Sequence, residues 1–149
     1  MQALAQTLAQ TIQTQTLESP KSTLSVQETG LVIKLVGPLG AGKTSFLKAF
    51  AKALGITKTL ISPSFNLNRS YQADRFTLEH WDLYRLSRLD PNLYHTITEQ
   101  VETAYTIVAI EWLDKFDWPF EKQITIHFDY PDKTESQDYQ FRNIELVYS

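Results

Sequence analysis

At 149 residues, 42% of them hydrophobic, with eight phenylalanines, seven tyrosines and three tryptophans, the chain has the composition of a folded domain and not of a disordered tail. Its formal net charge of −3 gives no overall basic field, which argues against strong direct nucleic-acid binding by the domain as a whole. The lack of cysteine excludes disulfides and thiolate chemistry, and no segment has the pattern of a signal peptide or a membrane span. We therefore expect a single cytoplasmic domain over residues 1–149.

The N-terminal segment is predicted to be a helix followed by a linker. Leu4, Leu8 and Ile12 recur at helical spacing within residues 2–16, which predicts an amphipathic helix with a narrow apolar face, lying on the surface. Residues 17–29 contain Pro20 and show no sustained period, so we expect a linker there. The core of the domain is then expected over residues 30–149.

A strand, a glycine-rich turn and a helix follow in that order. Residues 31–36 (LVIKLV) are almost all aliphatic, as is typical of a parallel strand buried on both faces. Residues 37–44 (GPLGAGKT) fit the G-x-x-x-x-G-K-[ST] pattern of a phosphate-binding loop. Apolar residues at helical spacing from Leu47 to Leu54 predict a helix that ends near Gly55. This order places a bound phosphate at a helix N-terminus, where free N–H groups favour anions.

Each part of this loop has an expected role in binding ATP and Mg²⁺. The glycines permit positive φ and a close approach of the backbone to the phosphate oxygens. Lys43 supplies a charge to the β- and γ-phosphates, and the Thr44 hydroxyl is placed as a ligand for Mg²⁺. The residues expected to contact the nucleotide here are Gly37, Pro38, Leu39, Gly40, Ala41, Gly42, Lys43, Thr44 and Ser45.

The rest of the chain predicts further strands and one more helix. We expect a short strand over 57–61, a hairpin of 65–71 with 76–81, a helix that begins at Asp90-Pro91, a buried strand over 105–110, and a C-terminal hairpin in which 139–148 pairs with the strand around 124–128. The predicted fold class is therefore α/β, a P-loop NTPase-like mixed sheet with flanking helices and an antiparallel C-terminal hairpin.

Two acidic residues are candidates for control of metal and water. Glu111 follows a buried strand, at the edge where open α/β sheets bind their ligands, and is placed to hold Mg²⁺ directly or through a water. Asp82 lies within His80-Trp81-Asp82-Leu83-Tyr84-Arg85, where it can orient a water or a metal-bound water. From the residues alone, the plainer interpretation of Asp82 as a cap at a solvated strand end is favoured.

Four motifs in order resemble those of one family. The loop at 37–44, Ser62-Pro63-Ser64-Phe65, the segment 80–86 (HWDLYRL) and Ile110-Glu111-Trp112 are similar to those of the bacterial tRNA threonylcarbamoyladenosine biosynthesis ATPase family, TsaE, formerly YjeE. The resemblance covers about residues 30–148. It implies that Lys43 and Thr44 hold phosphate and Mg²⁺, that Ser64 lies near the γ-phosphate, and that Asp82 and Glu111 manage metal and water.

The resemblance also implies an activity and partners. It implies an ATPase that is required for the modification of tRNA next to the anticodon without itself catalysing the transfer. We expect this ATPase to be weak in isolation, because no glutamine stands at the water-positioning place and Arg85 is the only motif arginine available in cis. The implied partners are the threonylcarbamoyl transferase subunit and that subunit's inactive paralogue. Contact with tRNA is implied only through this complex, and no contact with a membrane is implied.

Two other functions remain open at this point. One is a P-loop small-molecule kinase, which needs arginines over its active site; Arg69, Arg75, Arg85 and Arg88 cluster in the middle of the chain. The other is an interaction protein that senses ATP without hydrolysing it.

Overall fold

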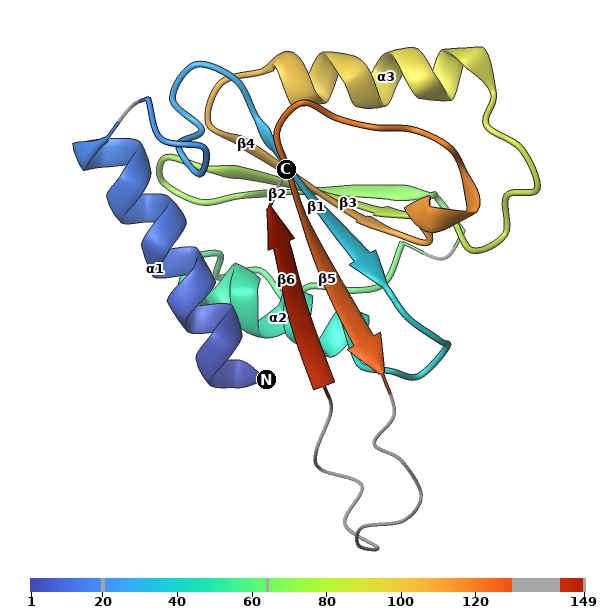
Figure 1. The fold of residues 1–149 in the computed structure, drawn as a ribbon, viewed down its shortest axis with the longest axis horizontal. Coiled ribbons are helices and arrows are strands. Elements are labelled where there is room, and N and C mark those ends of the chain that lie inside the picture. Colours follow the sequence, from blue (N-terminus) through green and yellow to red (C-terminus); the bar gives the residue numbers. More distant parts are fainter. Residues whose placement is uncertain (20, 64, 130–142, 149) are drawn as a thin grey trace, which may run out of the picture.

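A computed structural model describes residues 1–19, 21–63, 65–129 and 143–148 (Figure 1). Its elements are α1 (Gln2–Glu18), β1 (Leu31–Val36), α2 (Lys43–Ala53), β2 (Asn68–Gln72), β3 (Thr77–Asp82), α3 (Pro91–Glu102), β4 (Thr106–Glu111), the 3₁₀ turn η1 (Leu113–Lys115), β5 (Gln123–Asp129) and β6 (Asn143–Tyr148).

The strands form one mixed sheet in the order β2-β3-β4-β1-β5-β6. The pairs β3–β4, β4–β1 and β1–β5 are parallel, whereas β2 and β6 join the two edges in antiparallel orientation. The predicted mixed α/β sheet and its antiparallel C-terminal hairpin are therefore confirmed. Residues 139–142 of the predicted last strand lie outside the described residues. The parallel central strands all end at one edge, which is where the candidate site lies.

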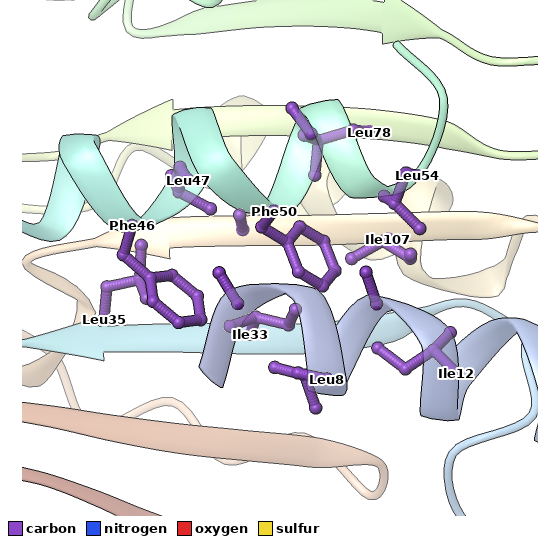
Figure 2. Close-up of a cluster of buried hydrophobic side chains, with 14 of the residues drawn as sticks. Leu8, Ile12, Ile33, Leu35, Phe46, Leu47, Phe50, Leu54, Leu78 and Ile107 are labelled. Atoms are coloured by element: carbon purple, nitrogen blue, oxygen red, sulfur yellow. The ribbon is translucent and has the colours of Figure 1, made fainter. Parts of the chain in front are cut away.

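Helices cover both faces of the sheet (Figure 1). On one face, α1 and α2 pack over side chains from the central strands, with Phe46, Phe50 and Ile12 at the centre of this cluster (Figure 2). On the other face, Ile97 of α3 is buried against Val108 and Ile110 of β4. Because both faces are covered, β4 is buried along its whole length, as its aliphatic sequence predicts.

The N-terminal helix is more deeply packed than its sequence suggests. It ends at Glu18, two residues beyond the predicted helix, and buries Ala5, Leu8, Ala9 and Ile12 along one face. The two alanines widen the apolar face beyond the predicted leucine and isoleucine stripe and let α1 approach α2 closely. The segment predicted as a linker is also attached to the core, since Val26 is fully buried and its N–H donates to the Thr16 hydroxyl at 3.1 Å.

The strand predicted over 57–61 is wrong. That segment runs as an irregular connection from α2 toward β2. The phenolic oxygen of Tyr71 makes the two hydrogen bonds that a neighbouring strand would make to Ile61. It accepts from the Ile61 N–H at 2.9 Å and donates to the Ile61 carbonyl at 3.1 Å. Pro63, which has no N–H to donate, lies two residues after Ile61, so a strand ladder could not continue there.

The helix predicted to begin at Asp90-Pro91 is confirmed. Pro91 is its first residue, where a missing N–H costs nothing, and the Asp90 carboxylate accepts from the Asn92 N–H at 2.7 Å as an N-cap. The hairpin expected from 65–71 and 76–81 is also present, as β2 and β3, although β2 begins at Asn68 and residues 65–67 form a turn before it. Among the described residues, no helix is long and apolar enough to cross a membrane.

The packing of α1 leads to a stability prediction. Ile12→Ala should lower the free energy of unfolding by about 2–5 kcal/mol, because it opens a cavity under a fully buried side chain. Gln10→Ala, at an exposed position of the same helix, should change it by less than about 0.5 kcal/mol. Urea unfolding followed by far-UV circular dichroism measures both. Equal effects of the two substitutions would mean that α1 is not docked as described.

Candidate functional site

The loop between β1 and α2 has the backbone of a phosphate cradle. Gly40 and Gly42 have φ values of 76° and 100°, which side chains other than glycine rarely adopt. Gly37 begins the loop beside β5, where a Cβ atom would come within 2.4 Å of the Phe128 carbonyl oxygen. The loop therefore needs glycine both for its conformation and for its close contact with the sheet.

Lys43 turns its ammonium group back into this loop. The side chain is only 4% exposed, and Nζ donates to the carbonyl oxygens of Gly37 at 2.6 Å and Pro38 at 2.9 Å. The Trp112 ring lies 4.2 Å from Nζ, a cation–π contact. Burial lowers the pKa of this ammonium below its ordinary value of 10.5, although the nearby carboxylate of Glu111 partly opposes the shift. The loop thus holds a buried cation whose hydrogen bonds go to neutral carbonyl oxygens.

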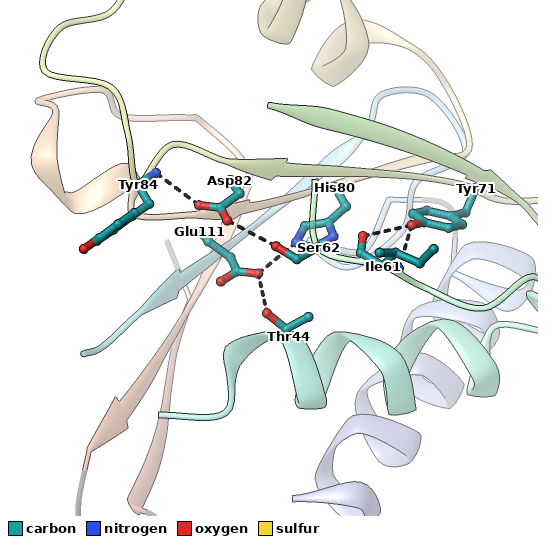
Figure 3. A network of polar contacts seen from close by, with 8 residues as sticks. All are labelled: Thr44, Ile61, Ser62, Tyr71, His80, Asp82, Tyr84 and Glu111. Carbon is teal, nitrogen blue, oxygen red and sulfur yellow. Dashed lines mark hydrogen bonds and ion pairs between the residues drawn. The ribbon is translucent and has the colours of Figure 1, made fainter. Parts of the chain in front are cut away.

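Glu111 joins three segments of the chain at one oxygen atom. The Thr44 hydroxyl donates to Oε1 of Glu111 at 3.2 Å, and Nε2 of His80 lies 2.8 Å from the same oxygen (Figure 3). Glu111 is the last residue of β4 and is 4% exposed. The buried Glu111 carboxylate therefore links the first turn of α2 to the end of β4.

Asp82 lies beside Glu111 because β3 and β4 are parallel and in register at these two residues. Its Oδ1 accepts from the Tyr84 N–H at 3.1 Å, and its Oδ2 accepts from the Ser62 hydroxyl at 3.4 Å (Figure 3). The capping role favoured for Asp82 from the residues alone is present at Tyr84. The same carboxylate also lines the cavity, so Asp82 both caps the turn at Tyr84 and belongs to the site.

These groups surround a cavity of about 390 Å³. Its lining residues are Leu39, Gly40, Gly42, Lys43, Thr44, Ser45, Ser62, Asp82, Tyr84, Arg85, Glu111 and Trp112. The loop residues Gly37, Pro38 and Ala41 do not line it, although the first two carbonyls bind Lys43. The candidate nucleotide contact Ser64 lies outside the described residues.

His80 is the residue of this site that sequence reasoning missed. The sequence placed it in the segment 80–85 but assigned it no role. A signal was present, because alternation along a strand puts residues 80 and 82 on the same face of β3. What the sequence lacked was the register between β3 and β4, which sets His80 opposite Ala109 and next to Glu111.

The oxygen atoms at this site suit Mg²⁺. Hydroxyl and carboxylate oxygens are the protein ligands that Mg²⁺ takes, together with water and phosphate oxygens. Within residues 1–19, 21–63, 65–129 and 143–148 there is no group of three or more His, Asp or Glu residues able to hold a metal ion by themselves. A magnesium ion bound mainly through phosphates and water needs no such group, so Thr44, Glu111 and Asp82 fit it.

Comparison with known proteins assigns the chain to a family. The family model described as "Threonylcarbamoyl adenosine biosynthesis protein TsaE" matches residues 1–139. The chain belongs to the TsaE family. This agrees with the resemblance seen in the four motifs.

The matches to individual relatives span different shares of this chain and of each relative. The protein named tRNA threonylcarbamoyladenosine biosynthesis protein TsaE from Nostoc is 39% identical over 111 residues, which is 72% of this chain and 68% of the relative. The protein of the same name from Synechocystis is 40% identical over 88 residues, which is 58% of this chain and 56% of the relative. The crystal structure of YdiB from Bacillus subtilis superposes with a TM-score of 0.53 at 27% identity, covering 89% of this chain and 75% of that one.

The buried lysine leads to a prediction about pH. Because its pKa is lowered in the folded state, Lys43 loses its proton at a lower pH in the folded than in the unfolded chain. The free energy of unfolding of the wild type, measured relative to Lys43→Met, should therefore rise as the pH approaches 10.5 from below. Urea unfolding of both proteins across this range measures the difference. A difference that stays flat or falls would contradict the burial of the charged group.

Proposed function

We propose that the chain is a magnesium-dependent ATPase required for threonylcarbamoyladenosine modification of tRNA next to the anticodon. The observation that carries this proposal is the meeting of Lys43, Thr44, Asp82 and Glu111 around one cavity at a phosphate-loop backbone. Family membership supports the pathway, since the relatives carry the name of that biosynthesis. The expected cytoplasmic location is part of this proposal.

In the proposed reaction, the loop binds the polyphosphate of ATP. Lys43 exchanges the carbonyl oxygens of Gly37 and Pro38 for phosphate oxygens, which supply the negative charge that these carbonyls lack. The backbone N–H groups from Gly42 to Ser45 stand at the N-terminus of α2, a position that favours anions. Ser64 is retained in the proposal as a residue near the γ-phosphate.

The proposed roles of the acidic residues follow from their contacts. Thr44 and Glu111, whose hydroxyl and carboxylate oxygens lie 3.2 Å apart, would together hold Mg²⁺, directly or through a water. Mg²⁺, when bound, neutralises charge on the phosphate oxygens. Asp82 lies next to Glu111, and we assign to it the orientation of the attacking water.

Hydrolysis is proposed to be slow until the protein joins its complex. Among the described residues that line the cavity there is one arginine, Arg85, and no glutamine that could position water. A transition-state arginine supplied in trans typically accelerates hydrolysis by on the order of 10³–10⁵. The proposed partners are the threonylcarbamoyl transferase subunit and its inactive paralogue, with tRNA contacted only through them.

The arrangement of arginines does not favour a small-molecule kinase. Of the four arginines in the middle of the chain, only Arg85 lines the cavity, and its guanidinium stacks on the Phe65 ring at 4.6 Å. Phosphate from labelled ATP should therefore appear as free phosphate and not on a small acceptor. A non-hydrolysing sensor is excluded if phosphate is released when the partners and tRNA are present.

The assigned roles predict that the two carboxylates affect turnover more than binding. Asp82→Asn and Glu111→Gln should each lower the turnover rate in the full assembly by on the order of 10²-fold or more, because these groups act mainly in the transition state. Affinity for ATP, measured by calorimetry at saturating Mg²⁺, should change much less. Asp117→Asn removes an exposed carboxylate outside the cavity and serves as the control. Wild-type turnover in Asp82→Asn would return Asp82 to a purely capping role.

Trp112 should report nucleotide binding by its fluorescence. It contacts Lys43 and lines the cavity, whereas Trp81 and Trp118 are buried in the cluster beneath α3. Titration with Mg²⁺-ATP should change the emission of the wild type and leave that of Trp112→Phe nearly constant. Phosphate release measured in parallel should rise when both partners are added. A signal that persists in Trp112→Phe, or equal turnover with and without partners, would contradict these claims.

A further inference from the structure

His80 is a buried titratable residue that the proposed function has not used. Its side chain is 0% exposed, and Nε2 lies 2.8 Å from Oε1 of Glu111. We infer that His80 is a positioning residue: its Nε2–H donor holds the Glu111 carboxylate in the orientation in which that carboxylate and Thr44 take up Mg²⁺. The inference rests on the proposed function and adds to it a residue that touches neither nucleotide nor metal.

The proposed metal role of Glu111 determines which atom donates. A carboxylate that binds Mg²⁺ is ionised and only accepts hydrogen bonds, so the inference places the proton between the two atoms on Nε2 of His80. The Thr44 hydroxyl donates to the same Oε1. Both donors thus restrain one oxygen of Glu111, and the other oxygen is engaged by neither of them. Hydrogen-bonded partners of this kind commonly set the orientation of metal-binding carboxylates.

The sheet holds the imidazole in place. His80 is in the middle of the parallel pairing between β3 and β4, where it lies opposite Ala109. The small side chain of Ala109 leaves room on this face for the ring to reach Glu111, two residues further along β4. Because both strands are buried at these positions, the imidazole cannot turn away without disturbing the core.

A purely structural role explains the buried imidazole poorly. Nδ1 of His80 is buried and has no hydrogen-bond partner among the described residues. A buried polar atom without a partner is destabilising, so an apolar side chain of similar size would pack there at lower cost. The contact of Nε2 with Glu111 is the feature that such a side chain would lose.

The chain contains a matched control for this pair. His95 and Glu99 also form a histidine–glutamate contact, with Nε2 3.2 Å from Oε1, but their side chains are 73% and 63% exposed on α3. Water competes for both groups there, and neither residue lines the cavity. His95→Leu therefore removes the same kind of group without changing the site.

The test measures how ATP affinity depends on Mg²⁺, by calorimetry, in the wild type, His80→Leu, His80→Gln and His95→Leu. In His80→Leu, the Mg²⁺ concentration that gives half of the gain in ATP affinity should rise by about 10–100-fold, the usual effect of losing such a partner. ATP affinity in excess chelator should stay close to that of the wild type. His80→Gln, whose amide can donate in place of Nε2, should recover most of the loss, and His95→Leu should behave as the wild type.

A second comparison separates positioning from packing. If His80 acts through Glu111, His80→Leu should have little further effect on the Mg²⁺ response in a Glu111→Gln background. An equal effect in both backgrounds would overturn the inference. So would a Mg²⁺ response in His80→Leu that matches the wild type. A wild type that binds ATP with no response to Mg²⁺ would instead remove the proposed metal role of Glu111, and with it the basis of the inference.

One measurement does not depend on whether the variants fold. Nitrogen-15 NMR of the wild type distinguishes a proton on Nε2 from one on Nδ1 of His80. We expect the proton on Nε2, with a change in the His80 signals when Mg²⁺-ATP binds. An unprotonated Nε2 cannot donate to the carboxylate and would overturn the inference.

Discussion

The site depends on placing a buried ammonium and a buried carboxylate at one end of a parallel sheet. Lys43 and Glu111 are each 4% exposed. Among the described residues, Lys43 makes no direct contact with a carboxylate, and Glu111 makes none with a lysine. Burying charge in this way is costly, so neutral groups around it must supply hydrogen bonds. The carbonyls of Gly37 and Pro38 do so for the lysine, and the Thr44 hydroxyl and His80 imidazole do so for the glutamate.

The rest of the fold keeps these groups together. The loop follows β1, Asp82 ends β3 and Glu111 ends β4, and all three strands are parallel neighbours. Side chains of α1 and α2 pack on one face and α3 on the other, which fixes the strands against each other. The groups of the site are therefore positioned by packed strands and helices, the kind of preorganisation on which electrostatic stabilisation depends.

Local patterns predicted the parts of the structure whose chemistry is local. The strand at 31–36, the glycine loop, the helix after it and the capped helix at Asp90 all depend on residues close in sequence, and each was confirmed. The position of Ile61 was mispredicted because a phenol from Tyr71 replaces a neighbouring strand. The role of His80 depends on the register with a strand about thirty residues away, which periodicity cannot reveal. The buried face of α1 was underestimated because alanines carry little hydrophobic signal.

The contact between Gly37 and Phe128 has a consequence for how this sequence can vary. The first residue of the loop lies so close to the backbone of β5 that even one added carbon would meet the Phe128 carbonyl at 2.4 Å. The obstacle is main chain, so no change of side chain at position 128 can make room for it. Compensation would require a shift of the whole strand. Mutational tolerance at the start of the loop is therefore limited by the main chain of a strand that is distant in sequence.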